Sequence, residues 1–242
     1  MTVLIDAQSL VKVYGAQTGV SVHALAGVDI QVQEGEFVGI AGPSGSGKST
    51  LLNVLGCLDR PTSGRYLLDG LDVAVLSDRE LSRIRSSTVG FVFQSFNLLP
   101  RLSVLENIGL PLAYAGVARR ERRRRAEELA DRLGLADRAS HRPSELSGGQ
   151  AQRVGIARAL ASSPRAVFAD EPTGNVDSKT AEGILELLVE LHRDGMTIVL
   201  VSHDERIVSA ADRAVHIIDG QVATDGTPGR LRQEHDTGEP TG

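Results

Sequence analysis

The chain has little cysteine, little lysine and no long apolar run. Cys57 is the single cysteine among 242 residues, so no internal disulfide forms, and a buried place in a reducing compartment suits this thiol. No apolar stretch approaches the roughly 18 residues that cross a bilayer, and the N-terminus does not read as a signal peptide. We therefore expect a cytoplasmic chain that neither enters nor spans a membrane unaided.

The balance of charge excludes further classes of protein. The formal net charge of −5 argues against a broad nucleic-acid-binding surface, and no heptad pattern indicates a coiled-coil arm. With 41% hydrophobic and 24% charged residues, the composition is ordinary for one soluble α/β domain. We therefore predict a single globular domain without a nucleic-acid partner.

A glycine-rich segment carries the first recognisable chemistry. Residues 42–49 fit the pattern G-x-x-x-x-G-K-[ST], in which backbone N–H groups and a helix N-terminus surround phosphate oxygens. Residues 36–41 predict a buried strand before it, and residues 49–55 predict a helix after it, with Cys57 buried in that helix. Only three lysines accompany 23 arginines, so composition does not explain Lys48, whose compact ammonium suits nucleotide phosphates. The alternative reading is a glycine-rich turn without a ligand.

The phosphate-binding residues predicted from this segment are Gly42, Pro43, Ser44, Gly45, Ser46, Gly47, Lys48, Ser49 and Thr50.

Two acids end a second apolar run, residues 165–169. Asp170 and Glu171 follow it directly, as carboxylates do at the C-terminal edge of a buried parallel strand. Asp170 is placed to hold Mg²⁺ together with the Ser49 hydroxyl, and Glu171 to polarise an attacking water as general base. Alone, such a pair reads as a solvated strand end. The sequence Pro-Thr-Gly-Asn-Val-Asp that follows at 172–177 argues against that reading.

Two further apolar runs end in polar side chains that suit the same site. His203 follows the run 197–201, and Gln94 follows the run 89–93. In an open α/β sheet both would emerge at the edge that binds ligands, His203 toward a γ-phosphate and Gln94 toward Mg²⁺ or its water. Each of them alone is an ordinary polar end of a strand.

The segment 146–150, Leu-Ser-Gly-Gly-Gln, lies about a hundred residues beyond the phosphate-binding loop. Local geometry cannot bring it to that same loop, so the sequence predicts an ATPase that works as a pair. Ser147, Gly148 and Gly149 offer a hydroxyl and backbone N–H groups at the start of a helix predicted over residues 149–161, and Gln150 completes the motif. The purely structural reading is a turn followed by a helix N-cap.

In this order the motifs resemble the nucleotide-binding domain of ABC transporters, over residues 4–226. The resemblance implies an α/β fold, a P-loop NTPase (RecA-like) core with an N-terminal antiparallel β subdomain and an inserted α-helical subdomain, about residues 96–159. Alternating apolar residues at 10–14 and 28–32 agree with the β subdomain. We predict one ATPase domain over residues 1–226 and, from composition, a disordered tail over residues 227–242.

The resemblance also assigns roles to single residues. Tyr14 matches the aromatic side chain that stacks on adenine, Gln94 the Q-loop, and residues 174–177, which end in Asp177, the D-loop. The catalytic residues that it implies are Glu171, His203 and Lys48, and the implied Mg²⁺ ligands are Ser49, Gln94 and Asp170. The nucleotide is ATP, and Ser147, Gly148, Gly149 and Gln150 would contact the γ-phosphate held by a second copy.

The implied partners are that second copy, in a head-to-tail dimer, and an integral-membrane subunit that docks near the Q-loop on the inner face of the cell membrane. The segments 35–38, 58–64, 90–100 and 172–175 resemble the subgroup that serves lipoprotein release, macrolide export and cell division. Ala151, Gly155 and Val176 stand where glutamine, alanine and leucine are common in that subgroup, and none of the three touches the predicted chemistry.

Three functional classes follow from the resemblance. The first is an ATPase that energises a membrane complex, by efflux or by mechanotransmission. The second is an ATP-dependent scaffold of a cell-envelope or cell-division complex that transports no substrate. The third, an ABC ATPase of ribosomes or DNA, usually carries tandem domains, metal-cluster cysteines or coiled-coil arms, and this chain shows none of them.

Three local patterns complete the sequence reading. Residues 77–80 and 103–106 both fit a capping box that opens a helix. The apolar loop 94–100 is either a docking surface or part of the packing of the helical subdomain. The basic stretch 119–125 is either a solvated helix face or a contact for anionic lipid headgroups or an acidic partner loop.

Overall fold

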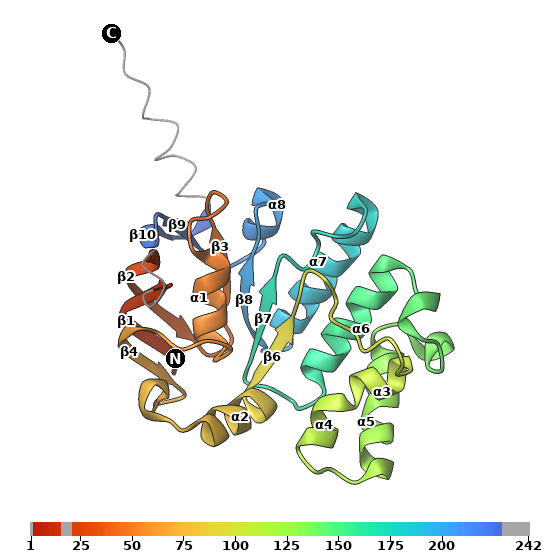
Figure 1. Cartoon of the computed structure of the whole chain (residues 1–242). Helices are drawn as coiled ribbons and strands as arrows, with labels where there is room; N and C mark the ends of the chain where they lie inside the picture. The colour runs from red at the N-terminus through yellow and green to blue at the C-terminus, as the bar shows by residue number, and fades with distance from the viewer. Residues whose placement is uncertain (1, 16–20, 229–242) are drawn as a thin grey trace. The chain divides into compact units, whose positions relative to one another are not determined.

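Figure 1 shows a computed structural model of the chain, which describes residues 2–15 and 21–228. The chain folds as two compact units, one over Met1–Val75 and Thr197–Gly242 and the other over Leu76–Met196. Most of the predicted tail, residues 229–242, lies outside the described residues. Within the described ranges no helix is both long and apolar enough to cross a bilayer.

The first unit opens with a four-stranded antiparallel sheet in the order β2-β1-β4-β5. Its strands are β1 (Val3–Tyr14), β2 (Val22–Gln33), β4 (Ser63–Leu68) and β5 (Leu71–Asp72), and the 3-10 turn η1 (Val73–Val75) follows. Along β2 the side chains alternate, since Val28, Ile30 and Val32 are buried whereas Asp29 and Gln31 are exposed. The predicted antiparallel β subdomain is therefore confirmed.

A second set of strands in this unit holds the glycine-rich loop. The strand order is β10-β9-β3-β8, with β3 parallel to both β9 and β8 and with β10 antiparallel to β9. The elements are β3 (Phe37–Ala41), α1 (Lys48–Leu55), β8 (Thr197–Val201), α8 (Glu205–Val208), β9 (Arg213–Ile218) and β10 (Gln221–Gly226). Strands β3 and β8 are buried along their whole length, as the unbroken apolar runs of a parallel sheet are.

Cys57 differs in one respect from the prediction. Its side chain is buried, as expected, but the residue lies beyond the end of α1 rather than inside that helix. The helix ends because Gly56 forms its C-cap and Cys57 turns the chain with a φ of 57°. A left-handed residue directly after the cap is a common way for a helix to stop.

The second unit is mainly helical and contains one pair of parallel strands, β6 and β7. Its elements are α2 (Asp78–Ser87), β6 (Val89–Val92), α3 (Val104–Ile108), α4 (Leu110–Tyr114), α5 (Arg119–Arg132), η2 (Ala136–Arg138), η3 (Pro143–Glu145), α6 (Gly148–Leu160), β7 (Ala166–Asp170) and α7 (Ser178–Arg193). Phe91 of β6 stacks on Phe168 of β7, with ring centroids 6.0 Å apart. Helices α3 to α6 confirm the helical subdomain, and its bounds at 96 and 159 remain a prediction.

Both predicted capping boxes are present in this unit. The Ser77 hydroxyl accepts from the Glu80 N–H while the Glu80 carboxylate accepts from the Ser77 N–H, and Ser103 and Glu106 repeat the arrangement. Each box satisfies two backbone donors reciprocally, which fixes the first turns of α2 and α3.

The basic stretch lies on α5, and three of its six arginines, Arg123, Arg124 and Arg125, pair with acids of the same helix. Arg123 pairs with Glu127 at 2.8 Å, and Arg124 pairs with two glutamates of α5. Partners three or four residues apart share one helix face, so this part of the stretch is a solvated, ion-paired face. In the described part of the chain, no ion pair joins Arg120 or Arg122 to an acid.

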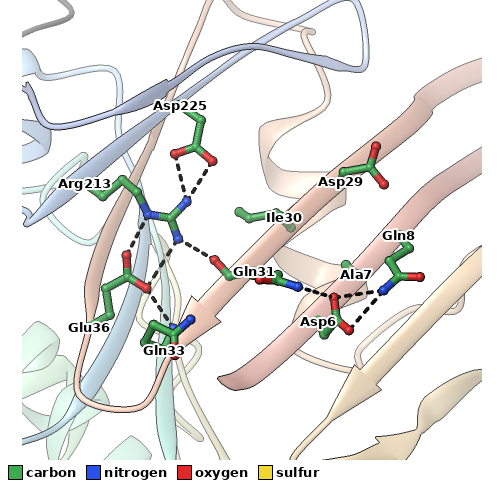
Figure 2. Close-up of a pocket in the computed structure, with 10 residues that line it drawn as sticks. All are labelled: Asp6, Ala7, Gln8, Asp29, Ile30, Gln31, Gln33, Glu36, Arg213 and Asp225. Atoms are coloured by element: carbon green, nitrogen blue, oxygen red, sulfur yellow. Dashed lines mark hydrogen bonds and ion pairs between the residues drawn. The ribbon is translucent and has the colours of Figure 1, made fainter. Parts of the chain in front are cut away.

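Arg213 of β9 ties three segments of the first unit together. Its guanidinium donates to Glu36 Oε1 at 2.6 Å, to both carboxylate oxygens of Asp225 at 2.8 Å and to the carbonyl of Gln31. Figure 2 shows these bonds at one end of an open groove of about 460 Å³. Burial lowers the pKa of Arg213, but its bonds to Glu36 and Asp225 outweigh this and raise it. Asp6, farther along the groove, accepts from two glutamine amides, so the polar lining is an internal network.

We expect Arg213→Met to lower the free energy of unfolding by about 1–3 kcal/mol, because Glu36 and Asp225 would keep partly desolvated charges without their partner. Arg213→Lys should recover less than half of the loss, since an ammonium cannot bind two carboxylates as a fork. Urea unfolding of the full chain measures the effect. Arg65→Met, at an exposed arginine of β4, is the control, and equal midpoints for the two methionine variants would contradict this role.

Candidate functional site

The glycine-rich loop joins β3 to α1 inside the first unit, and two of its glycines are required by close backbone contacts. Gly42 has a φ of 143°, and a Cβ there would lie 2.1 Å from the carbonyl oxygen of Ile217 in β9. Gly47 has a φ of 103°, and its Cβ would lie 2.3 Å from the carbonyl oxygen of Ala24 in β2. Only glycine fits at either position, and the loop is thereby fixed against two different strands.

Helix α1 begins at this loop without a side-chain cap. Its N-cap is Gly47, which has no side chain that could accept a hydrogen bond from the first N–H groups. The first turn contains no acid. By contrast, serines cap α2, α3 and α6 through their hydroxyl oxygens. The start of α1 therefore leaves N–H groups and the positive end of the helix dipole for an anion.

The side chains of the loop fit the phosphates of a nucleotide. Lys48 is 9% exposed, and its Nζ donates to the carbonyl of Pro43 at 2.7 Å, which holds the ammonium over the loop. The Ser46 hydroxyl is buried and has no hydrogen-bond partner among the described residues. A Cβ at Gly45 would meet no atom within 4 Å, so this side of the loop has room for a ligand.

Tyr14 ends β1 in the same unit, with 40% of its surface exposed. Its hydroxyl donates to Asp59 Oδ2 at 2.8 Å. Burial and this bond raise the pKa of the phenol, against an opposing hydrogen bond with Thr50 of α1. Because Thr50 directly follows the glycine-rich loop, the predicted adenine-stacking ring lies beside the phosphate-binding residues.

His203 lies directly beyond β8, at the same edge of the sheet as the glycine-rich loop. Strands β3 and β8 are parallel neighbours with Ile40 opposite Val201, so the segments that follow them leave the sheet at the same edge. The His203 side chain is exposed. His203 and the glycine-rich loop thus follow neighbouring strands at one edge of the sheet, and a contact of His203 with a γ-phosphate remains a prediction.

In the second unit, parallel pairing brings the predicted acids and glutamine to one edge. Val92 of β6 lies opposite Ala169 of β7, and Gln94 and Asp170 follow these residues closely. Glu171, the next residue, has a φ of 45°. A left-handed conformation is uncommon for a residue other than glycine and often marks a functional site.

Gln94 and the segment after Glu171 are in direct contact. Asn175 donates from its side-chain amide to the Gln94 carbonyl at 3.0 Å. A Cβ at Gly174 would lie 2.7 Å from Gln94 Nε2, so the glycine permits this approach. The predicted Q-loop and D-loop therefore pack against each other in this unit.

Arg158 of α6 also contributes to the site, and this was not predicted from the sequence. Phe96 and Asn97 have φ angles of 58° and 49°, and the Arg158 guanidinium donates to both of their carbonyls, at 2.9 and 2.5 Å. Burial lowers the pKa of Arg158. The two carbonyls accept hydrogen bonds from the buried guanidinium and so partly offset the loss of water around its charge. The available signal was an arginine in an otherwise buried apolar helix segment, because a buried charge needs a partner.

The segment 146–150 forms a turn followed by a helix N-cap, as the purely structural alternative predicts. Ser147 caps α6, accepting from the Gln150 N–H at 3.3 Å, and the Gln150 side chain accepts from the Ser147 N–H at 3.0 Å. A Cβ at Gly149 would lie 2.3 Å from Thr180 Cγ2, so this glycine permits close packing of α6 on α7. Helix α6 begins at Gly148, one position before the predicted start. Binding of a partner's phosphate by this segment remains a prediction.

The structure gathers the predicted residues in two sets. The first unit holds Tyr14, Gly42, Pro43, Ser44, Gly45, Ser46, Gly47, Lys48, Ser49, Thr50 and His203. The second unit holds Gln94, Ser147, Gly148, Gly149, Gln150, Asp170, Glu171 and Asp177. Asp177 caps α7 and accepts from the Thr180 N–H and hydroxyl at 3.0 and 2.6 Å, which lowers the pKa of its carboxyl. The sharing of one nucleotide by the two sets remains a prediction.

Comparison with known proteins identifies a family. A family model described as ABC transporter matches residues 25–174. An uncharacterized ABC transporter ATP-binding protein of Thermotoga maritima is 57% identical over 203 residues, which are 84% of this chain and 87% of that protein. The macrolide export ATP-binding/permease protein MacB of Marinobacter nauticus is 50% identical over 222 residues, 92% of this chain but 34% of the MacB chain. This chain thus spans about a third of that relative.

Solved structures agree with the sequence comparison. A dimeric structure of an ATP-binding cassette in a post-hydrolysis state, bound to ADP and Pi, has a TM-score of 0.85. It is 44% identical in sequence, and the match covers 93% of this chain and 98% of the other. The resemblance and the P-loop fold predicted from the sequence are therefore confirmed. The chain belongs to the ABC transporter family, as an ATP-binding subunit that hydrolyses ATP.

Proposed function

We propose that this chain energises a membrane complex of the macrolide-export or lipoprotein-release type, by efflux or mechanotransmission. ATP binding is supported mainly by the uncapped start of α1, with Lys48 and the buried Ser46 hydroxyl at the loop before it. The likeness to MacB, which its name describes as an ATP-binding/permease protein for macrolide export, supports the membrane part. The chain would act from the cytoplasmic face of the membrane.

In this proposal the two sets of site residues meet around one ATP. Lys48 offsets the negative charge of the transferring phosphoryl group, and His203 holds the γ-phosphate or the attacking water in position. Glu171 accepts a proton from that water as it attacks in line. The left-handed backbone of Glu171 supports this role, since it sets the direction of the carboxylate at the end of β7.

A Mg²⁺ ion would be held by Ser49, Gln94 and Asp170 together with the phosphates of ATP. A hydroxyl, an amide and a carboxylate all supply the oxygen atoms that Mg²⁺ prefers. When bound, the ion supplies charge stabilisation on the phosphate oxygens.

We further propose a head-to-tail dimer in which Ser147, Gly148 and Gly149 of one subunit bind the γ-phosphate held by the other. The N-terminus of α6 would add a second helix dipole at the same anion. Hydrolysis would then remove the anion that joins the subunits and let the dimer open. The dimeric ATP-binding cassettes among the similar structures support this arrangement.

A groove of about 960 Å³ in the second unit supports a membrane partner. It lies among α3, α4 and α5, with Leu105 and Leu110 in its lining and with Arg119 and Arg122 at the same groove. The lining also contains the acids Glu106, Glu127 and Asp137, and this mixture of apolar and charged residues of both signs suits a short amphipathic segment of an integral-membrane subunit. The second candidate function, an ATP-dependent scaffold of an envelope complex, would use every one of these residues as well.

The identity of the membrane partner separates the two candidates. Glu171→Gln with ATP should hold the complex closed during purification from the native membrane. A partner with few transmembrane segments and a large extracytoplasmic domain would support the proposed subgroup. A partner with many segments around a central cavity would contradict the subgroup and indicate conventional translocation.

Glu171→Gln should lower ATP turnover by about 10²–10⁴-fold and leave ATP affinity within about twofold of the original chain, because the amide cannot accept the proton of water. Steady-state phosphate release and calorimetric titration measure the two quantities. Glu186→Gln, an exposed acid on α7, is the matched control and should keep normal turnover. Near-normal turnover of Glu171→Gln would overturn the assignment of the general base.

Ser147→Arg in the Glu171→Gln chain should abolish the ATP-dependent dimer, because the large side chain would occupy the place of the partner's γ-phosphate. Sedimentation velocity should show a dimer for Glu171→Gln with ATP, a monomer with ADP, and a monomer for the double variant with either. Binding of ATP to the monomer should change by less than about threefold. Ser140→Arg, at an exposed serine, is the control. A double variant that still dimerises with ATP would exclude Ser147 from the interface.

A further inference from the structure

The segment 58–64, Leu-Asp-Arg-Pro-Thr-Ser-Gly, is one that the proposed function leaves without a role. It is bonded to the end of β1, the strand that carries Tyr14. The Thr62 N–H donates to the Val11 carbonyl at 2.7 Å, and the Val13 N–H donates to Thr62 Oγ1 at 3.0 Å. The backbone on either side of residue 12 is therefore bonded to this segment.

The close approach continues at Gly64, which directly follows the Val11–Ser63 pair of β1 and β4. Gly64 has a φ of 97°, and a Cβ there would lie 2.4 Å from the carbonyl oxygen of Ser9. A side chain at this position would push the segment away from β1. The segment thus sits close to the strand along its length, and its side chains reach the end of β1.

Lys12, one of the three lysines, joins this segment to the Tyr14 ring. Its Nζ donates to Asp59 Oδ1 at 2.6 Å and to the Arg60 carbonyl at 2.9 Å. The other carboxylate oxygen of Asp59 accepts from the Tyr14 hydroxyl at 2.8 Å. Lys12 Nζ also lies 4.8 Å from the centroid of the Tyr14 ring, over one face of it.

These contacts fix a ring that the backbone alone would leave movable. A tyrosine ring turns about two torsions, and here the hydroxyl at its far end is held by Asp59 while an ammonium covers one face. The Lys12 side chain is 13% exposed and the Asp59 side chain 33%, so water has limited access to the pair. With Tyr14 40% exposed, the other face of the ring is the one left to a planar ligand.

We propose that Lys12 and Asp59 are positioning residues that hold Tyr14 with one face open, so that a nucleobase stacks on it, and that they set nucleotide affinity without touching the phosphates. This inference rests on the proposed role of Tyr14 in stacking on adenine. The carboxylate of Asp59 is neutralised by Lys12, so the pair places no uncompensated negative charge near the ligand. Aromatic stacking requires a set orientation of the ring, and the clamp provides it.

The test compares ATP with tripolyphosphate, which carries three phosphates and no base. Calorimetric titration with Mg²⁺ gives the affinity of the full chain for both ligands, in the original chain and in Lys12→Met, Asp59→Asn and Tyr14→Ala. We expect Tyr14→Ala to weaken ATP binding by about 5–100-fold, which is the usual range for losing one base–aromatic stack. Lys12→Met and Asp59→Asn should weaken ATP binding by about 3–10-fold, since the ring remains but is no longer held. Tripolyphosphate affinity should stay unchanged in all three variants.

Steady-state kinetics and a double variant add independent readouts. The clamp variants should raise KM for ATP by the same factor as the loss in affinity and leave kcat unchanged. Lys12→Met should have no further effect in a chain that already carries Tyr14→Ala, because Lys12 acts through the ring. Arg65→Met removes an exposed positive charge from the neighbouring strand β4 and is the matched control.

Three results would overturn the inference, and they can be told apart. If Lys12→Met and Asp59→Asn weaken ATP and tripolyphosphate equally, they distort the phosphate-binding loop and do not position the base. If both keep the original ATP affinity while Tyr14→Ala loses it, Tyr14 stacks on the base without needing the clamp. If Tyr14→Ala itself binds ATP normally, the proposed role of Tyr14 fails, and the clamp has no ligand to serve.

Discussion

The uncapped start of α1 is the constraint on which the site depends. Backbone N–H groups, the Lys48 ammonium and the Ser46 hydroxyl all gather at one short loop, and none of the loop's own side chains is an acid that could neutralise them. Buried donors and charges without partners carry a cost in free energy, and the phosphates of a nucleotide remove it. By contrast, the side chains of Ser77, Ser103, Ser147 and Asp177 cap α2, α3, α6 and α7. An anion is therefore favoured at this loop over the starts of those four helices.

Close approach of backbones is the second condition, and glycines supply it in both units. Gly42 and Gly47 let β9 and β2 approach the phosphate-binding loop. In the second unit, Gly149 lets α7 approach the start of α6, and Gly174 lets the Gln94 side chain approach the segment after Glu171. In each place a Cβ would lie within 2.7 Å of another atom. The glycines of these motifs are thus needed for the packing around the site as well as for any contact with a ligand.

The parts of the structure that the sequence could predict are those encoded over short distances. The glycine-rich loop, the capping boxes of Ser77 and Ser103 and the acids after β7 all depend on residues a few positions apart. The bond from Lys12 to Asp59 spans 47 residues, and the bond from Arg158 to the Asn97 carbonyl spans 61. No periodicity or motif links such pairs, because the fold alone brings them together. The helix end at residue 55 agrees with the prediction, but Cys57 was wrongly placed inside the helix. A left-handed residue after a cap leaves no strong mark in the sequence when it is not glycine.

The scarcity of lysine has a consequence for chemical labelling of the protein. Of the three lysines, Lys12 is bonded to Asp59 and Lys48 is held over its loop by the Pro43 carbonyl, whereas Lys179 is exposed on the first turn of α7. Acylating reagents attack accessible amines, and lysine is their usual target in proteins. Among its lysine side chains the protein therefore offers one readily accessible amine, in the second unit. A dye or cross-linker introduced there would leave the nucleotide loop and the ring of Tyr14 unmodified.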